Sequence, residues 1–232
     1  MTITIDWTFI FSLGSFIALS TTAFFTFYRY FLLPRKERIE KARKELYQPL
    51  LWTLGSILGG IKQIDIESIR SRSIPFEENR CALPAELYEL LREFSSKRDE
   101  FVCWADCCKA AFDSVIYRAN DHPGFWELSK AYRARHDKSL AEDLSKELTP
   151  EFMKGTKVTK SWVLDHTDFF RRFTDKEETQ RFDSLIDFIS SQANSYPMNR
   201  LLSLLQRKAE DVANFGEKVR SRTAGHLQLP SS

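Results

Sequence analysis

The sequence predicts an all-α protein, with one N-terminal transmembrane helix followed by a cytosolic helical bundle. Three observations support this prediction. Residues 7–28 carry no formal charge, and a cluster of basic residues follows them directly. Through most of the remaining chain, apolar residues recur at the three-and-four spacing of an amphipathic helix. No segment shows the strict apolar–polar alternation that is typical of a strand.

The uncharged run predicts a transmembrane helix over residues 7–33, preceded by a short extracytoplasmic tail at 1–6. It contains 22 residues, and an apolar helix of about 20 residues crosses the roughly 30 Å hydrocarbon core of a bilayer. A cleaved signal peptide would need a basic start and a small-residue cleavage site, and the run has neither. Amphipathic rings favour the two headgroup zones, and the aromatic residues expected there are Trp7, Tyr28 and Tyr30.

A basic collar after the run predicts the orientation of the span. The collar consists of Arg29, Arg35, Lys36, Arg38, Lys41, Arg43 and Lys44. Lys and Arg accumulate on the cytoplasmic side of spans, so we expect the N-terminus outside and the C-terminal body in the cytoplasm. The collar is also expected to contact the anionic inner leaflet of the membrane.

Residues 34–61 are predicted to form a basic juxtamembrane helix followed by a short apolar segment. The second uncharged run, residues 46–61, has 16 residues, which is shorter than the roughly 18 typical of a span. It is either an interfacial or re-entrant helix or a core helix of the body. If it crossed the membrane, the body would lie on the opposite side.

The rest of the chain is predicted to be a linker at 62–83, a helical bundle at 84–222 and a flexible tail at 223–232. The longest helix is expected over residues 84–119, and residues 125–148 form one helix or a broken pair. A new element is expected to start at Thr149-Pro150. Thr174 and Glu177 have the spacing of a capping box that opens the next helix. The last helix is expected to start near Ser195 and Pro197.

Charge is unevenly distributed and argues against nucleic acid as a partner. The net charge of the chain is +2, but residues 29–44 hold seven basic and two acidic residues, a net of +5. With Asp6 contributing −1, residues 45–232 carry a net charge of −2. A nucleic-acid-binding domain needs a basic face for phosphate contacts, and the body lacks that excess.

Catalytic and cofactor motifs are missing from the sequence. None of the eight glycines belongs to a dinucleotide-binding or P-loop pattern, and the chain has no G-x-S-x-G, H-E-x-x-H or C-x-x-C. We therefore predict no catalytic residue and no cofactor.

Two clusters are weak candidates for a metal site. Cys103 and Cys107 share a helix face, and Asp106 with His122 would complete a tetrahedral set. His166 lies between Asp165 and Asp168 in the second cluster. Packing explains both clusters better, because free Cys and a His on an aromatic helix face commonly lie in a core. In a cytosolic body the four cysteines would stay reduced.

Small residues mark one face of the predicted span. Gly14, Ala18 and Thr22 follow each other at four-residue intervals. In lipid, close backbone approach and van der Waals packing decide helix association. This stripe predicts a homodimer, or pairing with the span of another protein.

The function predicted from the sequence is a single-pass membrane-anchored protein with a cytosolic interaction or scaffold module and a protein partner. One alternative is a membrane-tethered enzyme with a dispersed site drawn from His122, His166, Asp165 and Asp168. The other is a membrane-active effector or pore component, with residues 46–61 entering the bilayer beside the first span.

Overall fold

The computed structural model describes residues 20–228 except 22, 77–79, 166–171 and 174, and within them it is helical without a strand. Helices η1 and η2 are π-helical turns and η3 is a 3-10 turn. The elements are η1 Tyr28–Leu32, α2 Leu33–Ala42, η2 Arg43–Tyr47, α3 Gln48–Gln63, α4 Ile66–Arg70, η3 Arg80–Ala82, α5 Ala85–Asn120, α6 Trp126–His136, α7 Leu140–Met153, α8 Lys160–Asp165, α10 Lys176–Ala193 and α11 Tyr196–Gln228. The all-helical prediction is confirmed for these residues.

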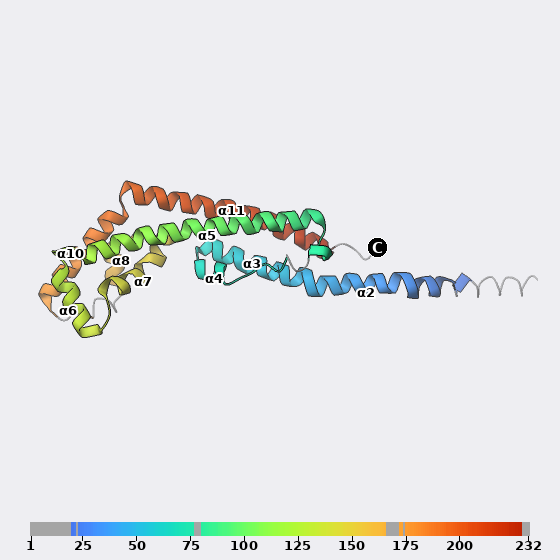
Figure 1. Cartoon of the computed structure of the whole chain (residues 1–232), viewed down its shortest axis with the longest axis horizontal. Helices are drawn as coiled ribbons and strands as arrows, with labels where there is room; N and C mark the ends of the chain where they lie inside the picture. The colour runs from blue at the N-terminus through green and yellow to red at the C-terminus, as the bar shows by residue number, and fades with distance from the viewer. Residues whose placement is uncertain (1–19, 22, 77–79, 166–171, 174, 229–232) are drawn as a thin grey trace, which may run out of the picture.

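The helical arm, defined here as the described residues between 20 and 45, leaves one end of an elongated bundle (Figure 1). Its helical backbone continues without a break into α3, through the two π-helical turns. Among the described residues, no helix combines the length and the apolar character that a bilayer crossing requires. Residues 7–19 and 22 of the predicted span, with Trp7 and the stripe of Gly14, Ala18 and Thr22, lie outside the described residues. The span therefore stays a prediction.

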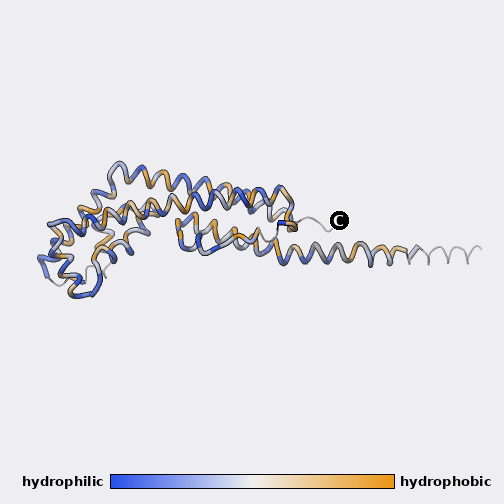
Figure 2. Tube along the Cα trace, viewed as in Figure 1, coloured by the Kyte–Doolittle hydropathy of each residue, from blue (hydrophilic) through white to orange (hydrophobic). Residues whose placement is uncertain are grey.

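The centre of the bundle is built around α11, which packs along both α5 and α3. Helix α11 runs antiparallel to α5 over most of its length (Figure 1). Hydrophobic and hydrophilic positions alternate along the bundle helices (Figure 2), as an amphipathic helix with one buried face requires. Leu58 of α3 and Phe94 of α5 are both buried over Gly216 of α11. This meeting point joins the three helices into one core.

The end of the bundle away from the arm is formed by α6, α7, α8 and α10 (Figure 1). Helices α7 and α10 both pack on α5, and α6 packs on α7 and α10. Phe112 of α5 and Phe152 of α7 stack with their ring centroids 4.2 Å apart. This distal end has its own aromatic core, continuous with the central one.

Strongly periodic helices lie where the sequence predicts them. The helix expected over 84–119 is α5, Ala85–Asn120, and the region 125–148 is a broken pair, α6 and α7. Asp175, rather than Thr174, caps α10, with its carboxylate accepting from the backbone N–H of Glu177 at 3.1 Å. Thr174 lies outside the described residues.

The prediction that a new element starts at Thr149-Pro150 is wrong, because Pro150 lies inside α7. The hydroxyls of Thr149 and Ser145 both donate to Asp113 of α5, each at 2.6 Å. These two bonds attach the last turns of α7 to α5. Pro150 lies three residues before the helix ends, and its missing N–H removes only the intrahelical bond to the carbonyl of Lys146.

Residues 46–61 form a core helix, which is one of the alternatives that the sequence leaves open. In α3 the buried face consists of Leu50, Leu54, Ile57, Leu58 and Ile61. This face packs against α11. The apolar character of the segment is therefore accounted for by burial in the bundle.

Residues 62–83, expected as a linker, contain the end of α3, the short helix α4 and the turn η3. The segment adds four side chains to the core: Ile69, Ile74, Phe76 and Leu83. Similarly, α11 continues through Gln228 into the expected flexible tail, and Thr223 is fully buried. The buried residues in these segments do not follow a clear helical period, so the sequence pattern does not predict their burial.

Candidate functional site

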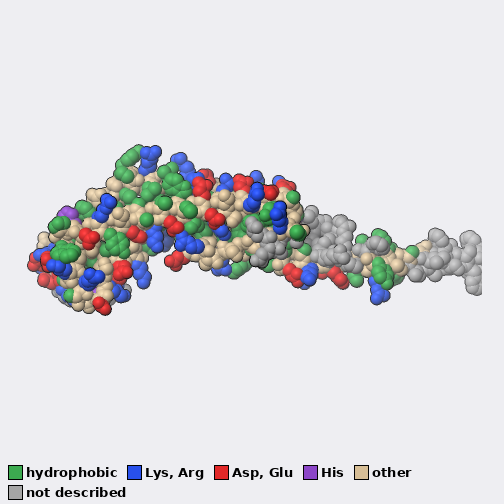
Figure 3. Space-filling model, viewed as in Figure 1, with side chains coloured by type: hydrophobic (Ala, Val, Ile, Leu, Met, Phe, Trp, Pro, Cys, Tyr) green, Lys and Arg blue, Asp and Glu red, His purple; other side chains and the backbone are tan. Residues whose placement is uncertain are grey.

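Exposed aromatic side chains are concentrated on the arm. Of the eleven large apolar side chains that are exposed in the described residues, six lie between residues 24 and 33. Phe25 and Tyr30 are each 69% exposed. Hydrophobic side chains are visible on the arm beyond the end of the bundle (Figure 3), whereas acidic and basic side chains are interspersed over the visible face of the bundle. The set comprises Phe24, Phe25, Phe27, Tyr28, Tyr30 and Leu33.

These side chains occupy a broad arc of the arm rather than one narrow stripe. At about 100° per residue, residues 24, 25, 27, 28 and 30 span an arc of about 220°, and the exposed residues Thr26 and Arg29 lie in the remaining sector. The contacts between them are local: the rings of Phe24 and Tyr28 stack with centroids 6.4 Å apart. This arc is wider than the apolar stripe of about 100° that an amphipathic helix buries against a core.

The basic collar begins inside this aromatic set and continues along α2 and η2. The side chains of Arg29, Lys41 and Lys44 are exposed. Lys41 lies 3.9 Å from Glu45, but both side chains are more than 60% exposed, so this pair contributes little to stability. The backbone positions of Arg35, Lys36, Arg38 and Lys41 fall on different sides of α2, at about 100° per residue.

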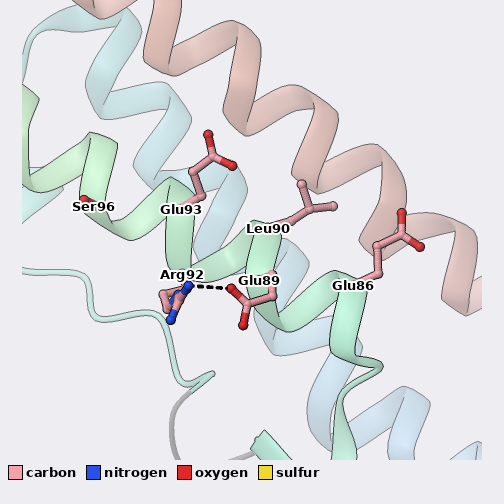
Figure 4. Close-up of a pocket in the computed structure, with 6 residues that line it drawn as sticks. All are labelled: Glu86, Glu89, Leu90, Arg92, Glu93 and Ser96. Atoms are coloured by element: carbon pink, nitrogen blue, oxygen red, sulfur yellow. Dashed lines mark ion pairs between the residues drawn. The ribbon is translucent and has the colours of Figure 1, made fainter.

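An open acidic hollow lies at the same end of the bundle, on the first turns of α5. Figure 4 shows Glu86, Leu90 and Glu93 pointing towards α11, with Glu89 and Arg92 on the other side, where they form an ion pair of 2.7 Å. Ser96 completes the lining, and the hollow has a volume of about 690 Å³. Its charge has the opposite sign to that of the collar. An anionic surface would repel it.

Cys103, Cys107 and His122 are not brought together. Both cysteines are exposed on α5, and His122 lies fifteen residues beyond Cys107, which is about 22 Å along a helix axis. His122 packs beside Phe125 and Phe188, and its Nδ1 accepts from the backbone N–H of Gly124 at 3.2 Å. Within the described residues, no group of three or more His, Cys, Asp or Glu side chains has the geometry of a metal site.

The other candidate ligands have different surroundings. Asp106 forms an ion pair of 2.6 Å with Arg70. Cys108 is buried, and burial raises the pKa of its thiol to about 11, so the unreactive thiol form persists. His166 and Asp168 lie outside the described residues.

A polar pocket at the distal end was not anticipated from the sequence. The phenol of Tyr132 on α6 donates to Asp143 Oδ2 of α7 at 2.6 Å and accepts from Arg172 Nη1 at 2.9 Å. Tyr132 is only 2% exposed, and burial, followed by the bond to Asp143, raises the pKa of its hydroxyl to about 12. The phenol therefore stays neutral and positions its neighbours. No short-range pattern could have identified this group, since Arg172 lies forty residues from Tyr132.

The described lining of the pocket includes neither of the two described residues expected for a dispersed catalytic site, His122 and Asp165. The described lining residues are Tyr132, His136, Lys138, Asp143, Lys146, Glu147 and Arg172. Comparison of the chain with protein-family models, with curated proteins and with solved structures finds no match.

Proposed function

We propose that this chain is a single-pass membrane protein, with residues 7–33 in the bilayer and the helical bundle acting as an interaction module on the cytoplasmic side. The observation that carries the proposal is the cluster of exposed aromatic side chains at residues 24–30. It lies on an arm that extends beyond the bundle and continues the uncharged run of the sequence.

Exposure of these aromatic side chains to water is energetically unfavourable. Removing one large apolar side chain from water contributes about 1.5–3 kcal/mol. Five partly exposed aromatic side chains therefore represent on the order of 5–10 kcal/mol that the bundle does not recover. A bilayer would recover it, with the tyrosines at the headgroup level.

The collar supports the orientation and an upright arm. Each Lys or Arg near an anionic leaflet contributes about 1 kcal/mol, and Glu37 and Glu40 offset part of this attraction. A helix that lies flat on a membrane carries its basic residues beside one apolar face. The collar positions on α2 are instead distributed around the axis, which favours a helix that stands in the headgroup layer. The acidic hollow on α5 favours a bundle held away from the surface.

The interaction role rests on the composition of the body. Its helices are amphipathic, its surface is of mixed charge, and its sequence lacks catalytic motifs. The pore alternative required residues 46–61 to enter the bilayer, and their apolar face is packed against α11. The enzyme alternative would be favoured by a deep polar pocket that contains two of the residues His122, His166, Asp165 and Asp168. Neither His122 nor Asp165 is among the described lining residues of the distal pocket.

Cysteine accessibility tests the topology. The exposed native cysteines at 81, 103 and 107 are first replaced by Ser, and Ser231→Cys adds a reporter on the body. We expect a membrane-impermeant maleimide to label this reporter only after the membrane is opened. The matched variant Thr4→Cys should react in sealed cells. Labelling of Ser231→Cys in sealed cells would overturn the orientation.

Extraction tests the span itself. A spanning helix should keep the protein in the membrane pellet through both high salt and alkaline carbonate. Release by salt alone would mean that the collar, and not a span, holds the protein at the membrane.

A further inference from the structure

One wall of the distal pocket is a network of hydrogen-bonded and ion-paired side chains. Arg172 donates to Tyr132 at 2.9 Å and to Asp143 at 3.2 Å, and its other terminal nitrogen lies 3.9 Å from Glu147. The carboxylates of Asp143 and Glu147 are thus paired with the guanidinium, and the buried phenol fixes the arrangement. These four side chains form one wall of a pocket of about 370 Å³.

Each of three other lining residues has a side-chain nitrogen that forms no hydrogen bond or ion pair within the described part of the chain. Lys138 and Lys146 are exposed and form no ion pair within the described part of the chain. The ring of His136 packs on Tyr132 with centroids 4.5 Å apart, and its Nε2 is buried without a hydrogen-bond partner. Most buried polar atoms in native proteins are hydrogen-bonded, so an unpartnered nitrogen beside a pocket is uncommon.

Taken together, the charges favour an anion. Arg172, Asp143 and Glu147 together carry −1, and the two lysines add +2, so these five described lining residues have a formal net charge of +1. We propose that the distal pocket binds a small soluble anion of the phosphate or carboxylate class, held by Lys138, Lys146 and the imidazole of His136. The volume lies within the range of small-molecule sites, roughly 300–1,000 Å³.

The position of the pocket favours a soluble anion over a lipid headgroup as the ligand. The arm leaves one end of the bundle, and helices α6 and α7, which carry most of the lining residues of the pocket, lie at the other end (Figure 1). Helix α5, which connects the two ends, has 36 residues, or about 54 Å at 1.5 Å per residue. A headgroup of the bilayer that holds the arm would not reach the pocket. The lining of the pocket consists of bundle residues, so anion binding does not depend on whether the arm enters a membrane.

Phosphate binding tests the proposal in the full chain, solubilised in a non-ionic detergent. Isothermal titration with inorganic phosphate at constant ionic strength should give saturable binding. Lys138→Gln and Lys146→Gln should each weaken binding about tenfold, the loss of about 1.4 kcal/mol. His136→Phe keeps a ring against Tyr132 and removes the nitrogen, and it should also weaken binding.

Lys109→Gln is the matched control, because it removes the same charge from an exposed site on α5 outside the pocket. It should leave phosphate binding unchanged. Equal weakening in Lys109→Gln and Lys146→Gln would show a general charge effect and overturn the site. Absence of saturable binding, or displacement of phosphate by vesicles that contain an anionic lipid, would also overturn a site for a soluble anion.

Discussion

Gly216 lies where α11 comes closest to both of its neighbours. A Cβ atom at this position would stand 2.5 Å from Leu58 Cδ2 and 2.6 Å from Phe94 Cε2. Both neighbours are at most 2% exposed, so neither can move into solvent. The absence of a side chain at this position is what allows α3, α5 and α11 to share one core.

Gly216→Ala should therefore destabilise the bundle. Overpacking costs typically 1–3 kcal/mol, and the better helix propensity of Ala offsets about 1 kcal/mol of this. Gly225→Ala is the control, since no atom lies within 4 Å of its added Cβ, and it should be neutral or stabilising. Urea unfolding of the detergent-solubilised chain, followed by tryptophan fluorescence, measures both. A stabilised Gly216→Ala would contradict the packing argument.

Tyr132 should make the stability of the bundle depend on alkaline pH. Burial raises the pKa of its hydroxyl from 10.0 to about 12 in the folded chain. Because the folded state holds this proton more tightly, the stabilisation is complete below pH 10 and is lost as pH rises towards 12. Two pKa units correspond to about 2.7 kcal/mol.

Tyr132→Phe isolates this contribution, because Phe has no proton to lose. Near pH 8 the variant should be less stable by about 1 kcal/mol, for the lost hydrogen bonds. Between pH 9 and pH 12 the wild type should lose more stability than the variant, by about 2–3 kcal/mol. Urea unfolding of both proteins across this range provides the measurement, and parallel pH curves would refute the assignment.

At the scale of the element, two helix starts with similar backbone geometry are capped differently. Asp175 accepts a hydrogen bond from the N–H of Glu177, whereas the side chain of Ser139 forms no cap bond at the start of α7. Both residues have an extended backbone. Ser139 and Glu142 have capping-box spacing, yet the spacing alone does not place the hydroxyl on the N–H groups that it would satisfy.

This difference predicts unequal effects of truncation. Asp175→Ala should destabilise the bundle by about 1 kcal/mol, the typical loss of an N-cap. Ser139→Ala should cost only a few tenths of a kcal/mol, because no cap bond is broken. The urea denaturation midpoints of the two variants, each compared with that of the wild type, measure these losses. Equal losses would mean that Ser139 does form its cap.

Elements also differ in how well their sequence predicts them. The limits and buried face of α5 follow from its spacing. In α10 the apolar residues at three-and-four spacing, Phe182, Leu185, Ile186 and Ile189, are all buried. Helix α7 extends past Thr149-Pro150 because Asp113, more than thirty residues away, binds its last turns. Periodicity is a local signal, and it fails where a distant side chain stabilises the end of an element.

For the molecule as a whole, the arm and the bundle have different surfaces. The arm exposes aromatic side chains over a broad arc of its helix, and the bundle exposes mixed charge. The predicted span adds a second property, the small residues Gly14, Ala18 and Thr22, which lie outside the described residues. In lipid, such a stripe allows two backbones to approach closely.

We therefore predict self-association through the span, or pairing with the span of a partner. Gly14→Ile and Ala18→Ile should each weaken the signal in a membrane two-hybrid assay, because the larger side chains hold the backbones apart. Phe16→Ile, on another face, should leave the signal unchanged. If the wild type gives no more signal than a monomeric control span, the stripe has no role in association.

The sequence by itself determined the helical class, the extent of the periodic helices, the uncharged run with its basic collar and the lack of catalytic motifs. Each of these depends on neighbours within a few helical turns. The tertiary structure decided that residues 46–61 form a core helix, that residues 62–83 add four side chains to the core, and that Tyr132, Asp143 and Arg172 meet in a distal pocket. These features depend on packing between segments far apart in the chain, and spacing within one segment contains no information about the surface that will cover it.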